Sequence, residues 1–178
     1  MVDMPTSAFI VEVPSVEGLI GDLRERFDST AQLGVPAHIT ILYPFMDPAQ
    51  VTPAILQMAQ EALNGVMTFG FSFEGVGRFQ TTAYLAPFPS APFIGMTASL
   101  VQTFPDYPPY GGEYAGCIPH LTVAHGDAIR AETAAAVLEE RLRLYGPFEA
   151  KCSSVVLIEN STGRWERMHV FQLPSEAA

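Results

Sequence analysis

Two short segments of the sequence pair a histidine with a threonine two positions later, as His38-Ile39-Thr40-Ile41 and His120-Leu121-Thr122-Val123. In a strand, residues two apart point to the same face, so each segment would present one imidazole beside one hydroxyl. The intervening residues are apolar and would pack into a core on the opposite face. A strand held in this way places its polar side chains rigidly, which is what catalysis requires.

Imidazole and hydroxyl groups in this combination suit displacement at phosphorus. The reaction needs a base that removes a proton from the nucleophile and an acid that protonates the departing oxygen, and a histidine with a pKa near ~6.5 can serve in either state at neutral pH. If the two strands face each other across a cleft, we expect His38 and His120 to form the acid–base pair. Thr40 and Thr122 would then donate hydrogen bonds to the non-bridging oxygens of the phosphate. This chemistry needs no metal ion or other cofactor.

Each of these residues also has an ordinary structural explanation. A histidine on an apolar strand is usually a structural residue, and threonine is common in strands because of its β propensity. The matched pair is what favours catalysis. The other histidines lack this pattern, and we interpret His125 as a strand-end residue and His169 as a surface or edge residue. Because the sequence contains no His-x-His or His-x-x-x-His spacing, it does not predict a two-metal centre.

The first motif lies in a part of the chain where strand and helix patterns alternate. Strands are expected over residues 8–13, 38–45 and 68–79. A helix is expected from Val16, with Ser15 as its N-cap, because apolar residues recur there at helical spacing. A second helix is expected from Thr52-Pro53 to Asn64-Gly65, since proline fits the first helical turn and Asn-Gly is a stop signal.

The second motif is surrounded by the same kind of pattern. Strands are expected over residues 83–88, 120–124, 148–158 and 165–173. Helices are expected from Ser90 to Phe104 and from Ala128 to Leu144. Residues 105–119 form a long loop rich in Pro, Gly and Tyr, and long ordered loops in compact domains are often lids or binding loops.

Tyrosines in and near this loop are candidate substrate contacts. Tyr107, Tyr110 and Tyr114 could stack on a base at the mouth of the cleft. Tyrosines beside prolines more often pack a loop down, so both interpretations stay open, with Tyr110 as the preferred contact. Tyr43, just after the first motif, is the second candidate.

The element order indicates a duplicated chain. Strand, helix, strand, helix, strand occurs twice in succession, and the motif histidines are 82 residues apart in a chain of 178. A separation near half of the length favours two copies of one structural unit. We therefore predict a single domain over residues 1–178, built from approximate repeats 7–80 and 82–160 and closed by a strand over 164–173.

Composition restricts the substrate class and the location. The formal net charge is −10 with only nine basic residues, so a long nucleic acid duplex would be repelled rather than bound. No apolar run approaches the roughly 18 residues of a membrane span, and the first residues lack the pattern of a signal peptide. We therefore expect a cytoplasmic protein, in which Cys117 and Cys152 are reduced.

The two motifs, the Tyr43-Pro44-Phe45 segment and the Pro-Pro-Tyr-Gly-Gly loop resemble the 2H phosphoesterase superfamily, and within it the bacterial 2′-5′ RNA ligase-like group. The resemblance covers nearly the whole chain. It implies a bilobal, duplicated α+β fold, in which two antiparallel sheets flanked by helices surround a central cleft with pseudo-two-fold symmetry. It also implies hydrolysis of 2′,3′-cyclic phosphates, 2′-5′ linkages or related cyclic phosphodiesters, with the motif histidines as acid and base and the motif threonines as phosphate ligands.

Two other functions are compatible with the sequence. The same cleft could bind a nucleotide or a phosphorylated ligand without converting it. The acidic surface could serve a protein-interaction domain, although no specific motif supports this. The partner we expect is a small nucleotide, a cyclic phosphate or a short oligonucleotide, bound by a monomer that makes no membrane contact.

Overall fold

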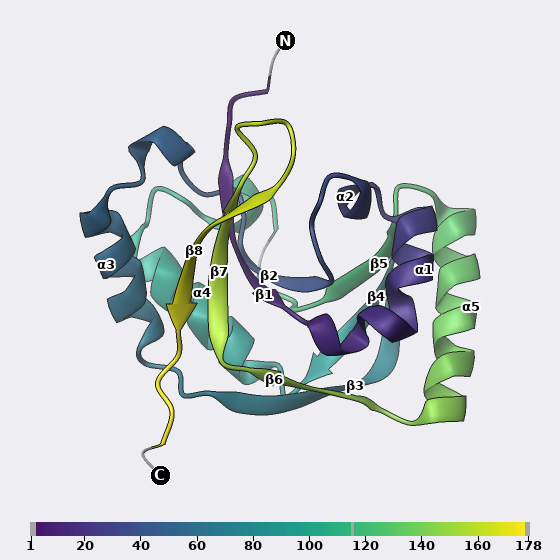
Figure 1. Cartoon of the computed structure of the whole chain (residues 1–178). Helices are drawn as coiled ribbons and strands as arrows, with labels where there is room; N and C mark the ends of the chain where they lie inside the picture. The colour runs from purple at the N-terminus through teal and green to yellow at the C-terminus, as the bar shows by residue number, and fades with distance from the viewer. Residues whose placement is uncertain (1–2, 115, 177–178) are drawn as a thin grey trace.

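The computed structural model describes residues 3–114 and 116–176. These residues form two four-stranded antiparallel sheets, sheet A with the strand order β2-β1-β7-β8 and sheet B with the order β5-β4-β3-β6 (Figure 1). The strands are β1 (Ser7–Glu12), β2 (His38–Leu42), β3 (Phe69–Phe79), β4 (Thr82–Phe88), β5 (Leu121–His125), β6 (Phe148–Cys152), β7 (Ser154–Glu159) and β8 (Glu166–Gln172). The first His-x-Thr motif lies in the edge strand β2, and the second begins at His120, immediately before the edge strand β5, which starts at Leu121 rather than at the predicted residue 120.

Helices flank both sheets. They are α1 (Glu17–Phe27), α2 (Ser29–Gln32), α3 (Pro53–Leu63), α4 (Ala91–Thr103) and α5 (Ala128–Tyr145), with the short 3-10 turns η1 (Pro14–Val16), η2 (Pro48–Gln50) and η3 (Pro109–Gly112). α3 and α4 pack against sheet A, whereas α1 and α5 pack against sheet B (Figure 1). α1 follows a strand of sheet A yet covers sheet B, and α4 follows a strand of sheet B yet covers sheet A. The predicted α+β fold with two antiparallel sheets flanked by helices is confirmed.

Local sequence signals begin two of the helices at the predicted positions. At α3, the Thr52 hydroxyl accepts a hydrogen bond from the amide of Ile55 at 3.3 Å, and Pro53 occupies the first turn. At α5, a carboxylate oxygen of Asp127 accepts from the amide of Arg130 at 2.9 Å. Both side chains satisfy amide groups that have no partner within the helix.

The predicted capping role of Ser15 is wrong. Residues Pro14–Val16 form η1, so α1 begins after Val16, one residue later than a Ser15 cap would place it. The Ser15 hydroxyl instead donates to the carbonyl of Glu149 at 3.3 Å. Pro14 explains the difference, because its ring presets a helical φ and the chain turns before the α-helix starts.

Two strands also end earlier than predicted. The run expected over 148–158 is divided at Ser153: β6 pairs with β3 in sheet B, and β7 pairs with β1 and β8 in sheet A. The apolar pattern of the sequence continues through Ser153, so the change from sheet B to sheet A is seen only from the strands with which β6 and β7 pair. β2 ends at Leu42 rather than Phe45, because Pro44 has no amide N–H for a ladder hydrogen bond.

Core packing fixes the two motif strands from one face. Ile39 and Ile41 of β2 and Leu121 and Val123 of β5 are buried, whereas the histidine and threonine of each motif are half-buried. Behind sheet B, α5 approaches closely because the contact is made by small residues. These are Ala131, Ala134 and Ala135 of the helix and Ala83 and Ala124 of the sheet. The apolar face of each motif strand is therefore packed against the core, and this packing places the polar side chains of the other face rigidly.

Candidate active site

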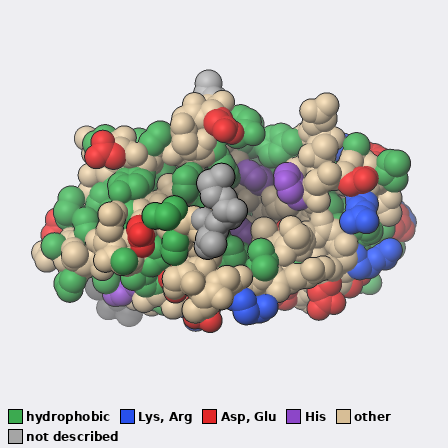
Figure 2. All heavy atoms as spheres, turned by 90° about the horizontal axis from the view of Figure 1, so that it is seen from above, with side chains coloured by type: hydrophobic (Ala, Val, Ile, Leu, Met, Phe, Trp, Pro, Cys, Tyr) green, Lys and Arg blue, Asp and Glu red, His purple; other side chains and the backbone are tan. Residues whose placement is uncertain are grey.

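The edge strands β2 and β5 lie next to each other, with Cα atoms of one within 8 Å of Cα atoms of the other. The two His-x-Thr motifs are therefore carried by neighbouring strands of different sheets. Seen from above, histidine side chains gather around a hollow in the surface (Figure 2).

Both motif histidines are held by the same local hydrogen bond. Nδ1 of His38 lies 2.8 Å from the carbonyl oxygen of Pro36, and Nδ1 of His120 lies 2.7 Å from that of Ile118. Because a carbonyl oxygen can only accept, Nδ1–H is the donor in each pair. The neutral ring then has its free lone pair on Nε2, which is the atom available to a substrate.

Burial shifts the pKa of both rings downward. It lowers the pKa of His38 to about 4; the hydrogen bond to Pro36 acts in the opposite direction, while the charges of Arg24 and His120 add to the lowering. Burial also lowers the pKa of His120 from 6.5. Both rings are therefore mainly neutral at pH 7, and the charge of a protonated His120 would lower the pKa of His38 further. A phosphate anion between them would favour the protonated form.

The motif threonines share the face of their histidines and are half-buried. Thr40 acts on the side chain of Tyr110: burial raises the pKa of Tyr110, and Thr40 opposes this shift. Thr122 lies opposite Tyr84 in the β4–β5 register. Each threonine is thus next to an aromatic residue of another segment.

Two aromatic rings that no local sequence pattern indicates lie beside His120. Phe79 and Tyr84 stack on each other with centroids 4.5 Å apart, and their centroids lie 5.3 and 5.4 Å from that of His120. Gly77, opposite Tyr84 in β3, leaves room for this arrangement, because a Cβ there would lie 2.1 Å from the tyrosine ring. Only the strand register reveals this contact.

The two predicted substrate-contact tyrosines are brought together at the other side of the site. The amide of Tyr110 donates to the carbonyl of Tyr43 at 2.6 Å, and their ring centroids are 6.3 Å apart. Trp165, which the sequence analysis also missed, lies 6.1 Å from Tyr43, and Tyr114 lies 5.8 Å from Tyr110. Tyr107 instead packs into the core against Phe45 at 5.0 Å.

The backbone at Tyr110 is strained. Its φ of 52° lies in the left-handed region, which a bulky residue rarely adopts. Gly111 and Gly112, with φ values of 64° and 81°, continue the turn at little cost. Such strain is kept where the surrounding structure imposes it, and here the Tyr110 amide is held by the carbonyl of Tyr43 at 2.6 Å.

Comparison with known proteins identifies the family of this chain. The family model described as the 2′-5′ RNA ligase superfamily matches residues 12–164. The chain belongs to the 2′-5′ RNA ligase superfamily. The predicted membership of the 2H phosphoesterases is confirmed by this match, and no curated protein matches the chain.

Solved structures share the fold of this superfamily member at low sequence identity. TT0787 of Thermus thermophilus is 14% identical with a TM-score of 0.60, covering 97% of this chain and 100% of that one. Escherichia coli LigT complexed with 3′-AMP is 14% identical with a TM-score of 0.60, covering 95% of this chain and 98% of that one. LigT complexed with NADP+ is 17% identical with a TM-score of 0.59, covering 97% and 99%.

The remaining two histidines, His125 and His169, contact residues outside the two motifs. His125 is exposed at the end of β5, where Nδ1 lies 2.8 Å from the Thr82 hydroxyl. His169 lies on the edge strand β8, with its ring 4.6 Å from that of Phe171. Within residues 3–114 and 116–176, no group of three or more His, Cys, Asp or Glu residues could hold a metal ion, and no helix is long and apolar enough to cross a membrane.

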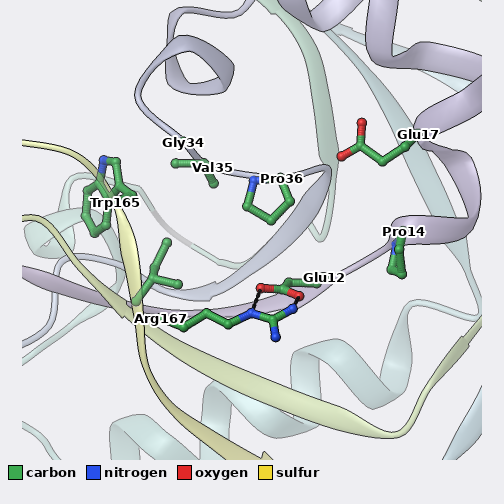
Figure 3. A pocket seen from close by; sticks show the side chains of 9 residues that line it. Glu12, Pro14, Glu17, Gly34, Val35, Pro36, Trp165 and Arg167 are labelled. Carbon is green, nitrogen blue, oxygen red and sulfur yellow. Dashed lines mark hydrogen bonds and ion pairs between the residues drawn. The ribbon is translucent and has the colours of Figure 1, made fainter.

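A pocket of about 320 Å³ lies beside the first motif (Figure 3). Glu12 in its wall pairs with His38 in the β1–β2 register and forms an ion pair with Arg167. Pro36, whose carbonyl holds the His38 ring, and Trp165 complete this side of the pocket. The pocket therefore adjoins the start of the first motif strand and has one aromatic residue, Trp165, in its wall.

Proposed function

We propose that this protein is a metal-independent phosphodiesterase that hydrolyses 2′,3′-cyclic phosphates, or 2′-5′-linked or cyclic nucleotides, with His38 and His120 as its acid–base pair. One observation carries the proposal. Each ring is held by a hydrogen bond from Nδ1 to the carbonyl two residues earlier, on neighbouring segments of the chain, and Nε2 of each ring is left for the substrate. General acid–base catalysis at phosphorus needs two such groups on opposite sides of the reacting centre.

In the proposed reaction, one neutral ring accepts a proton from water through Nε2 as the water oxygen forms a bond to phosphorus. The other ring, as the imidazolium, donates its proton to the departing sugar oxygen as the phosphorus–oxygen bond breaks. One water molecule is consumed, and the two rings exchange protonation states. The hydroxyls of Thr40 and Thr122 donate to the non-bridging oxygens, where charge develops.

The lowered pKa values have a consequence for the acid. Because both rings are mainly neutral at pH 7 in the free protein, one of them must gain a proton when the substrate binds. The negative charge of a phosphodiester supplies the driving force, since an opposite charge nearby raises the pKa of histidine. The substrate thus helps to create the protonation state that its own cleavage requires.

The surroundings of the motifs favour a small nucleotide as the substrate. Rings on both sides of the site offer stacking surfaces for a base, with Tyr43, Tyr110 and Trp165 on one side and Tyr84 on the other. Arg167 is already paired with Glu12, and the net charge is −10, so a polyanion is disfavoured. LigT structures contain 3′-AMP, NADP+ and ATP, which supports a nucleotide-sized ligand here.

Binding without conversion is the second candidate function, and one observation favours it. Burial lowers the pKa of both histidines, so a ligand that fails to raise either pKa would be held but not cleaved. Such a ligand would bind through the same threonines and aromatic rings.

A substrate screen separates the two functions. Purified protein would be incubated with 2′,3′-cyclic, 3′,5′-cyclic and 2′-5′-linked nucleotides in the presence of EDTA, and the products separated by chromatography. Turnover of one class with EDTA present supports the phosphodiesterase. Tight binding of a nucleotide that is recovered unchanged would replace it with the binding function.

A further inference from the structure

Arg24 and Asp28 are the only buried charged residues in the described part of the chain. Their side chains are each 3% exposed, and Nη2 of Arg24 lies 3.1 Å from Oδ2 of Asp28. Burial of an ion pair carries a desolvation penalty, and apolar residues of similar size are often at least as stabilising. Stability alone therefore does not explain this buried pair, and its hydrogen bonds to neighbouring segments indicate a role in positioning the chain.

The pair holds the chain immediately before β2. Nη2 of Arg24 donates to the carbonyl of Val35 at 3.0 Å. Two residues later, the amide of Ala37 donates to Oε1 of Glu17 at 2.6 Å, and the same oxygen lies 3.7 Å from Nη1 of Arg24. Side chains of α1 thus hold the peptide groups on both sides of Pro36; Figure 3 shows Glu17 and Pro36 in the wall of one pocket.

Asp28 connects this arrangement to the next helix. Its Oδ1 accepts from the amide of Thr30 at 3.1 Å and from the Thr30 hydroxyl at 2.8 Å, which begins α2. The connection between α1 and β2 is therefore held at both of its ends. We refer to Arg24, Asp28 and Glu17 as the α1 network.

We propose that the α1 network fixes the carbonyl of Pro36 and thereby the orientation and tautomer of the His38 ring. Proline has no amide N–H, so the peptide bond between Val35 and Pro36 is held through the Val35 carbonyl instead. The next peptide bond, which contains the Pro36 carbonyl, is held through the Ala37 amide. The Pro36 carbonyl then receives Nδ1–H of His38 at 2.8 Å. The network residues are positioning residues, because they act on the ring through the backbone.

The second motif has no counterpart of this network in the described part of the chain, where no charged side chain forms a hydrogen bond with the backbone of residues 116–119. The charges of Arg24, Asp28 and His120 act on the pKa of His38, and Glu12 lies opposite His38 in the β1–β2 register. The effect on the ring tautomer stands without the proposed function, whereas the effect on catalysis rests on it.

Nitrogen NMR of the histidine rings of the full chain tests the proposal. The variants are the double substitution Arg24→Leu/Asp28→Leu, which leaves no single buried charge, and Glu17→Ala. Glu17→Gln keeps an oxygen for the Ala37 amide and is the conservative rescue. Arg141→Met is the matched control, because Arg141 donates to the carbonyl of Leu19 at 2.6 Å and pairs with Asp22 at 2.7 Å elsewhere on α1.

We expect His38 to be mainly the Nδ1–H tautomer in the wild type, in Glu17→Gln and in the control. In Glu17→Ala and in the double variant, both tautomers should be populated, and kcat should fall at least ~10-fold while KM changes less than ~3-fold, as expected for lost orientation.

An unchanged tautomer in folded Glu17→Ala would overturn the proposal, whatever the activity. If the double variant does not fold, the comparison of Glu17→Ala with Glu17→Gln decides. If the wild type turns over no substrate, the proposed function fails, and the ring measurement still tests the network.

Discussion

The rings of His38 and His120 are fixed by equivalent hydrogen bonds. In each, Nδ1 donates to the carbonyl two residues earlier, at 2.8 Å for His38 and 2.7 Å for His120. Their surroundings differ. His120 lies against the rings of Phe79 and Tyr84, whereas the pKa of His38 responds to the charges of α1. Two rings with one tautomer and different environments can differ in proton affinity, which an acid and a base in one site require.

Removal of either ring should abolish most of the activity. We expect His38→Ala and His120→Ala each to lower kcat/KM for the best substrate of the screen by at least ~10²-fold, the typical loss of a general acid or base. His125→Ala, at the exposed end of β5, the strand that follows His120, is the control and should stay within ~3-fold of the wild type. Activity that survives both single substitutions would reject the acid–base pair.

The stability of the fold should depend on pH through His38. Its pKa is about 4 in the folded protein and 6.5 in the reference state. Because the folded-state value is the lower one, the unfolded chain binds the proton more readily between these values. Stability from this group is therefore fully present above pH 6.5 and is lost as pH falls toward 4.

Urea unfolding at pH 7.5 and at pH 4.5 measures this effect. Relative to His38→Asn, which has no titrating ring, the wild type should lose on the order of 2 kcal/mol of unfolding free energy between the two pH values. Equal losses in the two proteins would show that the His38 ring is not held in its neutral form.

A side chain at Gly77 should disturb the wall beside His120. In Gly77→Ala the added Cβ would lie 2.1 Å from the Tyr84 ring, so the ring must move. Overpacking of this kind typically costs about 1–3 kcal/mol, and we expect kcat/KM to fall ~10-fold as well. Gly75→Ala in the same strand is the matched control, because nothing lies within 4 Å of its added Cβ. Equal behaviour of the two variants would contradict a role for this packing.

A ring at position 43 should contribute to substrate binding. Tyr43 is 37% exposed, between Tyr110 and Trp165. Stacking of a base on an aromatic side chain is worth about 1–3 kcal/mol, so Tyr43→Ala should raise KM ~10-fold, and Tyr43→Phe should leave it within ~3-fold. Tyr145→Ala, a substitution of an exposed tyrosine at the end of α5, controls for loss of surface area. A normal KM in Tyr43→Ala would place the base elsewhere.

The sequence by itself determined the elements that carry the site. Two-residue periodicity places a histidine and a threonine on one face of each motif, and burial alternates in agreement over residues 38–41 and 120–123. Side-chain caps at Thr52 and Asp127 begin α3 and α5, because a capping bond spans only three residues. Signals of this range are contained in the local sequence.

Only the tertiary structure decided which groups meet. Nothing near Tyr84 in the sequence indicates that its ring covers Gly77 and contacts His120; the register of three strands produces that contact. The division of residues 148–158 between two sheets likewise depends on partner strands. The lowered pKa of His38 arises mainly from burial, a property of the folded surroundings rather than of the chain nearby. Strand pairing and desolvation act between residues far apart in sequence, so local pattern cannot specify them.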